Sequence, residues 1–95
     1  MKIVFLAQAV KELEEGFVFY NDQLKELGNQ FYTEVFDSIN IIQKYPTTWC
    51  RVGKNTRKCI LRRFSYLILY ILEEDKIIIT AIAHQHRKPL NYKSL

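Results

Sequence analysis

Apolar residues recur along the chain with two different periods, which predict helices in the first half and strands in the second. Residues 2–6 (KIVFL) are β-branched and aromatic and predict one short strand at the start. Between residues 10 and 27 the apolar positions are spaced three or four apart, which predicts one face of a helix. These positions are Val10, Leu13, Phe17, Tyr20, Leu24 and Leu27.

A second helical stripe follows after the short segment LKELGN. Phe31, Val35, Ile39 and Ile42 lie on one face, which Tyr32 and Phe36 widen. This helix should end at Tyr45, because a residue that precedes proline is disfavoured in the helical conformation. Two helices with a short connection predict an antiparallel hairpin. Gly16 lies inside the first helix, where glycine is unfavourable, so we expect the backbone of another segment to approach it closely.

Three strand-like runs follow, at residues 57–64, 66–72 and 76–84. Polar residues at 73–75 and the segment 64–66 connect them tightly, which predicts an antiparallel meander. We therefore expect an α+β fold in the order β-α-α-β-β-β, with the helical hairpin on one face of a small, mainly antiparallel sheet. Ninety-five residues are enough for a single domain, residues 1–95.

A hairpin can cover only one face of such a sheet, so the other face should be open. Small alanines allow a helix to lie close, which assigns Ile77, Ile79, Ala81 and Ala83 to the helices. The opposite set is then open: Ile78, Thr80, Ile82, His84 and His86. Phenol hydroxyls favour a route to water, which assigns Tyr66, Ile68 and Tyr70 to the open face as well. An apolar patch of this kind predicts that another polypeptide covers it.

Charge is distributed unevenly along the chain, and the net charge of +4 conceals this. Residues 1–50 hold four lysines and seven acids, a balance of −3, whereas residues 51–95 hold ten cations and three acids, a balance of +7. A basic surface favours an anionic partner, either a nucleic acid or an acidic protein. No apolar run reaches the about 20 residues of a membrane span, so we expect a cytoplasmic protein with no membrane partner.

The candidate binding residues are the cations of the second half and the residues beside them. Arg62 and Arg63 could converge with Lys58, Arg87, Lys88 and Lys93 around a phosphate. His84 and His86 are two apart on a strand and share a face, and imidazole titrates near neutral pH. Tyr92 could be a further proton donor.

Several signals of enzyme chemistry do not occur in the sequence. There is no glycine-rich phosphate loop, no pair of carboxylates in the basic half, and no recognisable nucleophile with a neighbouring base. Cys50 and Cys59 match neither a redox pair nor a zinc site, so we interpret them as reduced thiols. We therefore expect no metal, no cofactor and no ATP-using activity.

Four segments together resemble the RelE/ParE superfamily of bacterial toxins, most closely its ParE-like, plasmid-stabilisation branch. They are YPTTW at 45–49, LRRFSYLILY at 61–70, IIITAIAH at 77–84 and HRKP at 86–89. The resemblance covers nearly the whole chain. It implies the toxin of a type II toxin-antitoxin system, neutralised by a cognate antitoxin whose C-terminal segment wraps it. Contact with DNA would then be only indirect, through the antitoxin.

The family acts by two mechanisms: ParE-like members poison DNA gyrase, whereas RelE-like members cut messenger RNA in the ribosome. RelE-like nucleases typically place an arginine after the aromatic residue that opens the middle strand, and here that position is Leu67. We therefore favour a gyrase inhibitor that acts by binding and is not an enzyme. The alternatives are a metal-independent, ribosome-dependent mRNA endonuclease and a non-toxic partner of the antitoxin.

The resemblance and the charge pattern together assign two sets of site residues. The predicted target-binding or nucleic-acid-binding residues are Lys58, Arg62, Arg63, His84, His86, Arg87, Lys88 and Tyr92. The predicted antitoxin-binding residues are Tyr66, Ile68, Tyr70, Ile78 and Ile82. In the nuclease alternative, His84 or His86 would be the base, an arginine would stabilise the phosphorane, and Tyr92 or a histidine would be the acid.

Overall fold

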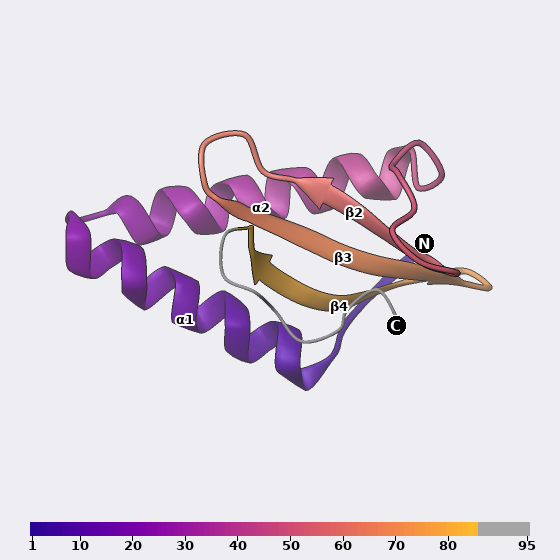
Figure 1. Ribbon diagram of the computed structural model, residues 1–95, viewed down its shortest axis with the longest axis horizontal. Helices are drawn as coiled ribbons and strands as arrows, with labels where there is room; N and C mark the ends of the chain where they lie inside the picture. Colours follow the sequence, from indigo (N-terminus) through magenta and orange to yellow (C-terminus); the bar gives the residue numbers. More distant parts are fainter. Residues whose placement is uncertain (86–95) are drawn as a thin grey trace.

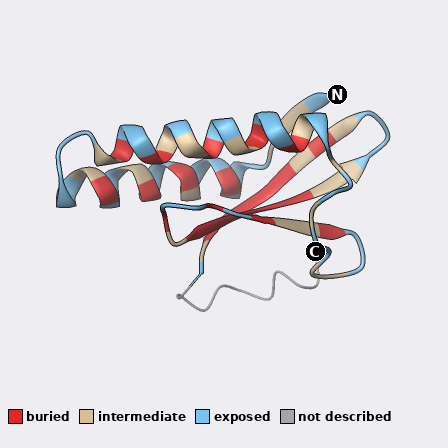
Figure 2. Cartoon of the chain, turned by 90° about the horizontal axis from the view of Figure 1, so that it is seen from above, coloured by how far each residue is buried: buried red, intermediate tan, exposed pale blue. Residues whose placement is uncertain are grey.

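The structure, a computed structural model, describes residues 1–85 and confirms the predicted order of strands and helices (Figure 1). The elements are β1 (Lys2–Phe5), α1 (Ala7–Gln23), α2 (Leu27–Lys44), β2 (Thr56–Ile60), β3 (Tyr66–Glu73) and β4 (Lys76–His84). The sheet has the order β1-β4-β3-β2, in which β1 is parallel to β4 and the other neighbours are antiparallel. Both helices lie side by side over one face of this sheet (Figure 2). The fold is therefore α+β.

Helix α1 buries a face that is rotated slightly from the predicted one. Ala9, Leu13, Gly16 and Tyr20 are buried, whereas Val10 and Leu24 are exposed. The rotation follows from Gly16, because a residue without a side chain lets the neighbouring helix approach. A Cβ atom at this position would lie 2.7 Å from Cε2 of Phe31, so the group that approaches Gly16 is a side chain of α2 and not the backbone that we expected.

Helix α2 buries the predicted stripe of Phe31, Val35, Ile39 and Ile42. It ends at Lys44, and Tyr45 has left the helical conformation directly before Pro46. The first turn of α2 is fixed to α1, since the amide of Gly28 donates to Oδ1 of Asn21 at 2.7 Å. The helical hairpin is thus held together at its turn as well as by the core.

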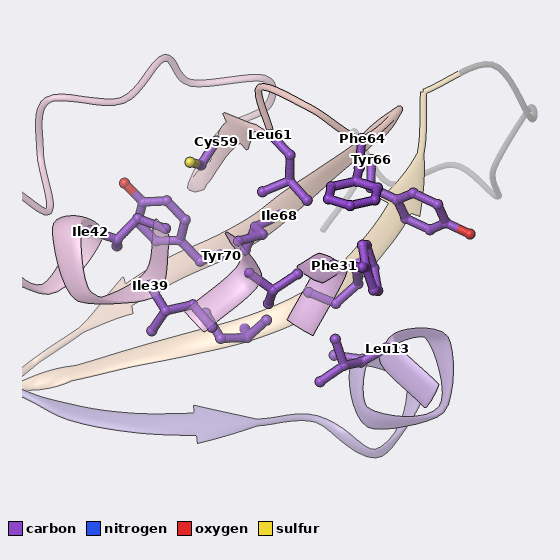
Figure 3. Packing of buried hydrophobic residues seen from close by; sticks show 14 of the residues in the cluster. Leu13, Phe31, Ile39, Ile42, Cys59, Leu61, Phe64, Tyr66, Ile68 and Tyr70 are labelled. Atoms are coloured by element: carbon purple, nitrogen blue, oxygen red, sulfur yellow. The ribbon is translucent and has the colours of Figure 1, made fainter. Parts of the chain in front are cut away.

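Aromatic rings fill one end of the core between the hairpin and the sheet (Figure 3). The ring of Phe31 lies 5.0 Å from that of Tyr66 and 5.5 Å from that of Phe64, measured between centroids. Tyr20 of α1 lies 4.7 Å from Phe64. Tilted and edge-to-face pairs of this kind stabilise a core beyond the area that they bury.

The predicted faces of β3 are wrong. Tyr66, Ile68 and Tyr70 belong to the cluster that the helices cover. The argument from phenol hydroxyls failed because the hydroxyl of Tyr70 finds a partner inside the fold: it donates to the carbonyl of Pro46 at 2.8 Å. The large side chains of β3 therefore fill the layer beneath the helices.

The predicted faces of β4 are correct in its first half and wrong in its second. Tyr70 pairs with Ile79, but Leu69 pairs with Ala81, so Thr80 is an extra residue in a β-bulge. Ile77 and Ile79 face the helices as predicted, and Ile78 faces away. Beyond the bulge the alternation is inverted. The prediction was therefore wrong for four residues: Ile82 and His84 lie on the helix side, and Ala81 and Ala83 on the other side.

The second face of the sheet carries a small core of its own. Leu67, Leu69, Ala81 and Ala83 are buried there, and Val52 packs against them. The predicted bare apolar face is therefore wrong. Ile60, which is 49% exposed, is the one large apolar side chain of the described strands that is open to solvent. The other exposed large apolar residues of the described chain are Met1, Leu6, Val10, Val18, Phe19, Leu24, Phe36, Ile41 and Tyr45.

Strand β2 forms one edge of the sheet and is shorter than predicted, because it ends at Ile60. Its outer side pairs with the segment 50–52: the amide of Lys58 donates to the carbonyl of Cys50 at 2.9 Å, and that of Val52 to Thr56 at 2.8 Å. Arg57 reaches back from β2 and donates to the carbonyls of Thr47 and Trp49. The loop between α2 and β2 is thus tied to the edge strand.

Candidate functional site

The loop between β2 and β3, residues 61–65, presents two consecutive arginines. Leu61 and Phe64 are buried in the main core, whereas Arg62 and Arg63 are exposed. The amide of Leu61 donates to the carbonyl of Tyr66 at 3.0 Å, which closes the base of the loop. We call residues 61–65 the arginine loop. Arg62 and Arg63 were predicted on a strand, and the structure places them on this loop instead, because β2 ends at Ile60.

Glu34 of α2 binds the backbone of the arginine loop. Its carboxylate accepts a short hydrogen bond from the amide of Arg62, and the amide of Arg63 lies 3.3 Å from both carboxylate oxygens. The same carboxylate forms an ion pair with Nε of Arg63 at 3.4 Å. The side chain of Glu34 is only 12% exposed, whereas that of Arg63 is 61% exposed. One partly buried carboxylate therefore anchors a loop whose cations face solvent.

The sequence analysis did not identify Glu34 as a site residue. Its place beside Val35, at the border of the buried stripe of α2, indicates a half-buried acid. Its partners are 28 and 29 residues away in the sequence, and no local pattern connects them.

The end of β4 lies beside the arginine loop. The amide of Gln85 donates to the carbonyl of Ser65 at 2.8 Å. His84 pairs with Tyr66 across the two strands, and their rings meet edge to face with centroids 5.0 Å apart. The structure therefore brings His84 to the same end of the sheet as Arg62 and Arg63. His86, Arg87, Lys88 and Tyr92 lie outside the described residues.

Lys58 lies on β2, opposite Leu69 on the second face, and is half-buried. It belongs to a run, residues 51–72, that contains six cations and no acid: Arg51, Lys54, Arg57, Lys58, Arg62 and Arg63. We call these six residues the basic edge, since they lie on β2 and the loops that flank it. The asymmetry of charge predicted from the sequence is thus concentrated along one edge of the sheet.

Four of the predicted antitoxin-binding residues lie beneath the helical hairpin. Tyr66, Ile68, Tyr70 and Ile82 are buried in the main core, and a partner could reach them only by displacing a helix. The argument that assigned them to a partner depended on an open face and fails with it. Ile78 lies on the second face, half-buried, and stays a predicted contact.

The Cys59 thiol and the Tyr70 hydroxyl are buried in the core and remain protonated near neutral pH. Burial raises the pKa of the Cys59 thiol from 9.0 to about 11, opposed by a hydrogen bond with Ser38 and assisted by the charge of Glu34. Burial also raises the pKa of the Tyr70 hydroxyl. Neither group is suited to act as a nucleophile or a base, because the reactive form is the ionised one.

Metal and membrane sites receive no support from the described part of the chain. Within residues 1–85, no three histidines, cysteines or acids lie close enough together to hold a metal ion. No helix in the same range is both long and apolar enough to cross a membrane.

Comparison with known proteins identifies the family. The model of a family described as the ParE toxin of the type II toxin-antitoxin system parDE matches residues 3–89. The chain belongs to the ParE toxin family. A solved structure described as the chromosomal ParDE system of P. aeruginosa superposes with a TM-score of 0.78, and the match covers 88% of this chain and 95% of the other. At 15% identity this likeness shows the fold alone. No curated protein sequence matches the chain.

Family membership confirms the resemblance that the sequence motifs indicated. The chain is a ParE toxin of a type II toxin-antitoxin system, and the parDE arrangement implies a cognate ParD antitoxin as its partner. Leu67, which stands where RelE-like nucleases typically carry an arginine, is buried in the small core of the second face.

Proposed function

We propose that this ParE toxin inhibits growth by binding DNA gyrase, and that the arginine loop and the basic edge make the contact. The observation that carries the proposal is the pair Arg62 and Arg63, exposed on a loop whose backbone is held by Glu34. Arginines on an ordered loop bind acidic protein surfaces well, because little side-chain and backbone freedom is lost on binding. The proposal places the protein in the bacterial cytoplasm, together with gyrase.

Binding explains the described residues better than RNA cleavage does. Cleavage needs a base, a cation on the phosphorane and an acid in one place. In the described chain the ring of His84 packs against Tyr66, and Tyr70 and Cys59 are buried and protonated. Leu67 supplies no cation. The cations of the arginine loop are suited to recognition, and within residues 1–85 the acid and base that a nuclease needs are not assembled beside them.

We further propose that the cognate ParD antitoxin binds the apolar surface of the helical hairpin, besides the predicted contact at Ile78. Four aromatic rings form a row: Phe5 lies 6.1 Å from Phe36, Phe36 lies 6.2 Å from Tyr32, and Tyr32 lies 4.6 Å from Phe17. Phe36 is exposed, as are Val10 and Ile41 on the same helices. Exposed apolar surface of this kind marks protein interaction sites. The toxin would then contact DNA only through its antitoxin.

The test compares two reactions with the purified toxin: supercoiling by gyrase, and translation in an extract in which the mRNA is monitored for cuts. The proposal predicts inhibited supercoiling and intact mRNA. Cut mRNA with normal supercoiling would replace gyrase by the ribosome as the target. No effect in either reaction, from a protein that binds its antitoxin, would support the non-toxic role.

A further inference from the structure

We propose that Glu34 is a positioning residue for target binding: it holds the arginine loop in the shape that presents Arg62 and Arg63. The inference depends on the proposed function, because it gives Glu34 a role through the two arginines. Glu34 itself is largely buried and touches the backbone of the loop from beneath.

The backbone of the arginine loop supplies the first argument. Strand β2 ends at Ile60 and β3 begins at Tyr66, so the amides of Arg62 and Arg63 have no partner in the sheet. Both amides converge on the carboxylate of Glu34. These hydrogen bonds are exposed, but a carboxylate forms stronger bonds to backbone amides than a neutral acceptor such as water does. Glu34 therefore determines how the tip of the loop is oriented.

The charges at the loop supply the second argument. Glu34 contacts Arg63 at Nε, near the base of the guanidinium, while the side chain remains mostly exposed. The Cζ atom of Arg63 lies 5.8 Å from the centroid of the Phe64 ring, a second contact that orients the same side chain. Arg62 forms no ion pair with any residue in the range 1–85. Glu34 thus orients one arginine without neutralising the other.

The base of the arginine loop is anchored independently of Glu34, so a role of Glu34 in positioning the loop can be distinguished from a role in folding. Leu61 and Phe64 are buried in the main core, and the amide of Leu61 bonds to Tyr66 without the help of Glu34. Removal of the carboxylate should therefore release the tip of the loop while its base and the core stay in place. A loop that must be ordered on binding has a lower affinity than one that is ordered beforehand.

The experiment compares Glu34→Ala and Glu34→Gln with two controls on the same helix. Asp37→Ala removes an exposed acid one turn away. Ile39→Val lowers stability through the core and keeps the carboxylate of Glu34. Each full-length protein is measured by inhibition of gyrase supercoiling, by thermal unfolding, and by the NMR shifts of the amides of Arg62 and Arg63.

We expect Glu34→Ala to weaken inhibition about tenfold, because two side chains must then be ordered on binding. Both amide proton signals should move upfield, because the amides of Arg62 and Arg63 lose their acceptor. Glu34→Gln should fall between this variant and the wild type, since the amide oxygen still accepts a hydrogen bond but carries no charge. Asp37→Ala should match the wild type. Ile39→Val should lower the melting temperature but leave inhibition unchanged at a temperature where it is folded.

Three results would overturn the inference, and a fourth would overturn the function beneath it. A positioning role of Glu34 is excluded if Glu34→Ala inhibits gyrase like the wild type, or if the amide signals of the loop do not change. It is also excluded if Ile39→Val loses inhibition in the same proportion to its fall in melting temperature. If Glu34→Ala does not fold, Glu34→Gln decides by the same criteria. If the double variant Arg62→Ala/Arg63→Ala inhibits gyrase fully, the proposed function itself fails, whatever Glu34 does.

Discussion

The two faces of the sheet differ in size and in the residues that they bury. The helix-covered face packs Tyr66, Ile68 and Tyr70 against both helices, whereas the second face buries Leu67 and Leu69 among small residues. Large side chains fill the layer beneath the helices, whereas on the second face Val52 is the one loop residue of the described chain that packs against the small residues. Among the strand residues that the structure describes, neither face leaves a broad apolar surface, which is why the proposed recognition sites lie on the loops, the edge and the helices.

The largest effect that this comparison predicts is at Phe31, which is fully buried and lies among Tyr20, Phe64 and Tyr66. Phe31→Ala should lower the free energy of unfolding by about 3–5 kcal/mol, because it leaves a cavity in the aromatic cluster. Phe36→Ala on the same helix should cost no more than about 1.5 kcal/mol, since Phe36 is exposed and loses mainly its ring contacts. Denaturant unfolding measures both, and equal losses would contradict the position of the core.

A matched pair on β3 compares the two faces directly. Ile68 and Leu69 are neighbours, both fully buried, on opposite faces. We expect Ile68→Ala to cost about 4 kcal/mol and Leu69→Ala about 2 kcal/mol, because a small cluster can collapse around the lost atoms more easily. Unfolding in urea would show the difference. The reverse order would mean that the second face is the main core.

A hydrogen bond from β4 to Glu12 tests the packing at the other edge of the sheet. Strand β1 pairs with β4 only as far as Ile79, and beyond it the carboxylate of Glu12 accepts the amide of Ile82 at 2.9 Å. Glu12→Ala should cost about 1–3 kcal/mol, because that amide would lose its acceptor. Glu15→Ala, which changes an exposed acid of the same helix, should stay within about 0.5 kcal/mol of the wild type in thermal unfolding. Equal effects would show that the contact contributes nothing.

The smallest predicted effect is a pH dependence from Cys59 on the covered face. The unfolded chain releases this thiol proton near pH 9, whereas the folded chain holds it until about pH 11. The folded state thus binds more protons in this window, and its stability falls as the pH rises through it. Cys59→Ala should reduce the slope of the unfolding free energy between pH 8.5 and 10.5. Cys50→Ala, which changes an exposed thiol, is the matched control.

The sequence predicts those parts of the fold that depend on local pattern. The stripe of α2 from Phe31 to Ile42 and its end before Pro46 follow from spacing and from proline. The order of the elements follows in the same way. The resemblance to the family could also be recognised from the sequence, since its motifs lie within contiguous segments.

The remaining features depend on contacts between distant segments. The bulge at Thr80 inverts the second half of β4, and strand alternation contains no signal of the extra residue. The hydroxyl of Tyr70 donates to a carbonyl 24 residues away in the sequence, and for this reason the faces predicted for β3 were wrong. The cations of the site were visible in the sequence, but Glu34, which orders two of them, was not. For a binding site on loops, the residue types can be predicted from the sequence more easily than their arrangement in space.

The most direct test of the account is gyrase supercoiling with two double variants that lose the same charge. Arg62→Ala/Arg63→Ala removes the cations of the arginine loop, and Lys11→Ala/Lys25→Ala removes two exposed cations of the helical hairpin. The account predicts that the arginine variant loses at least about tenfold in inhibition, as expected at a central contact, while the lysine variant inhibits like the wild type. Equal inhibition by the two variants, both folded, would contradict a target site at this loop.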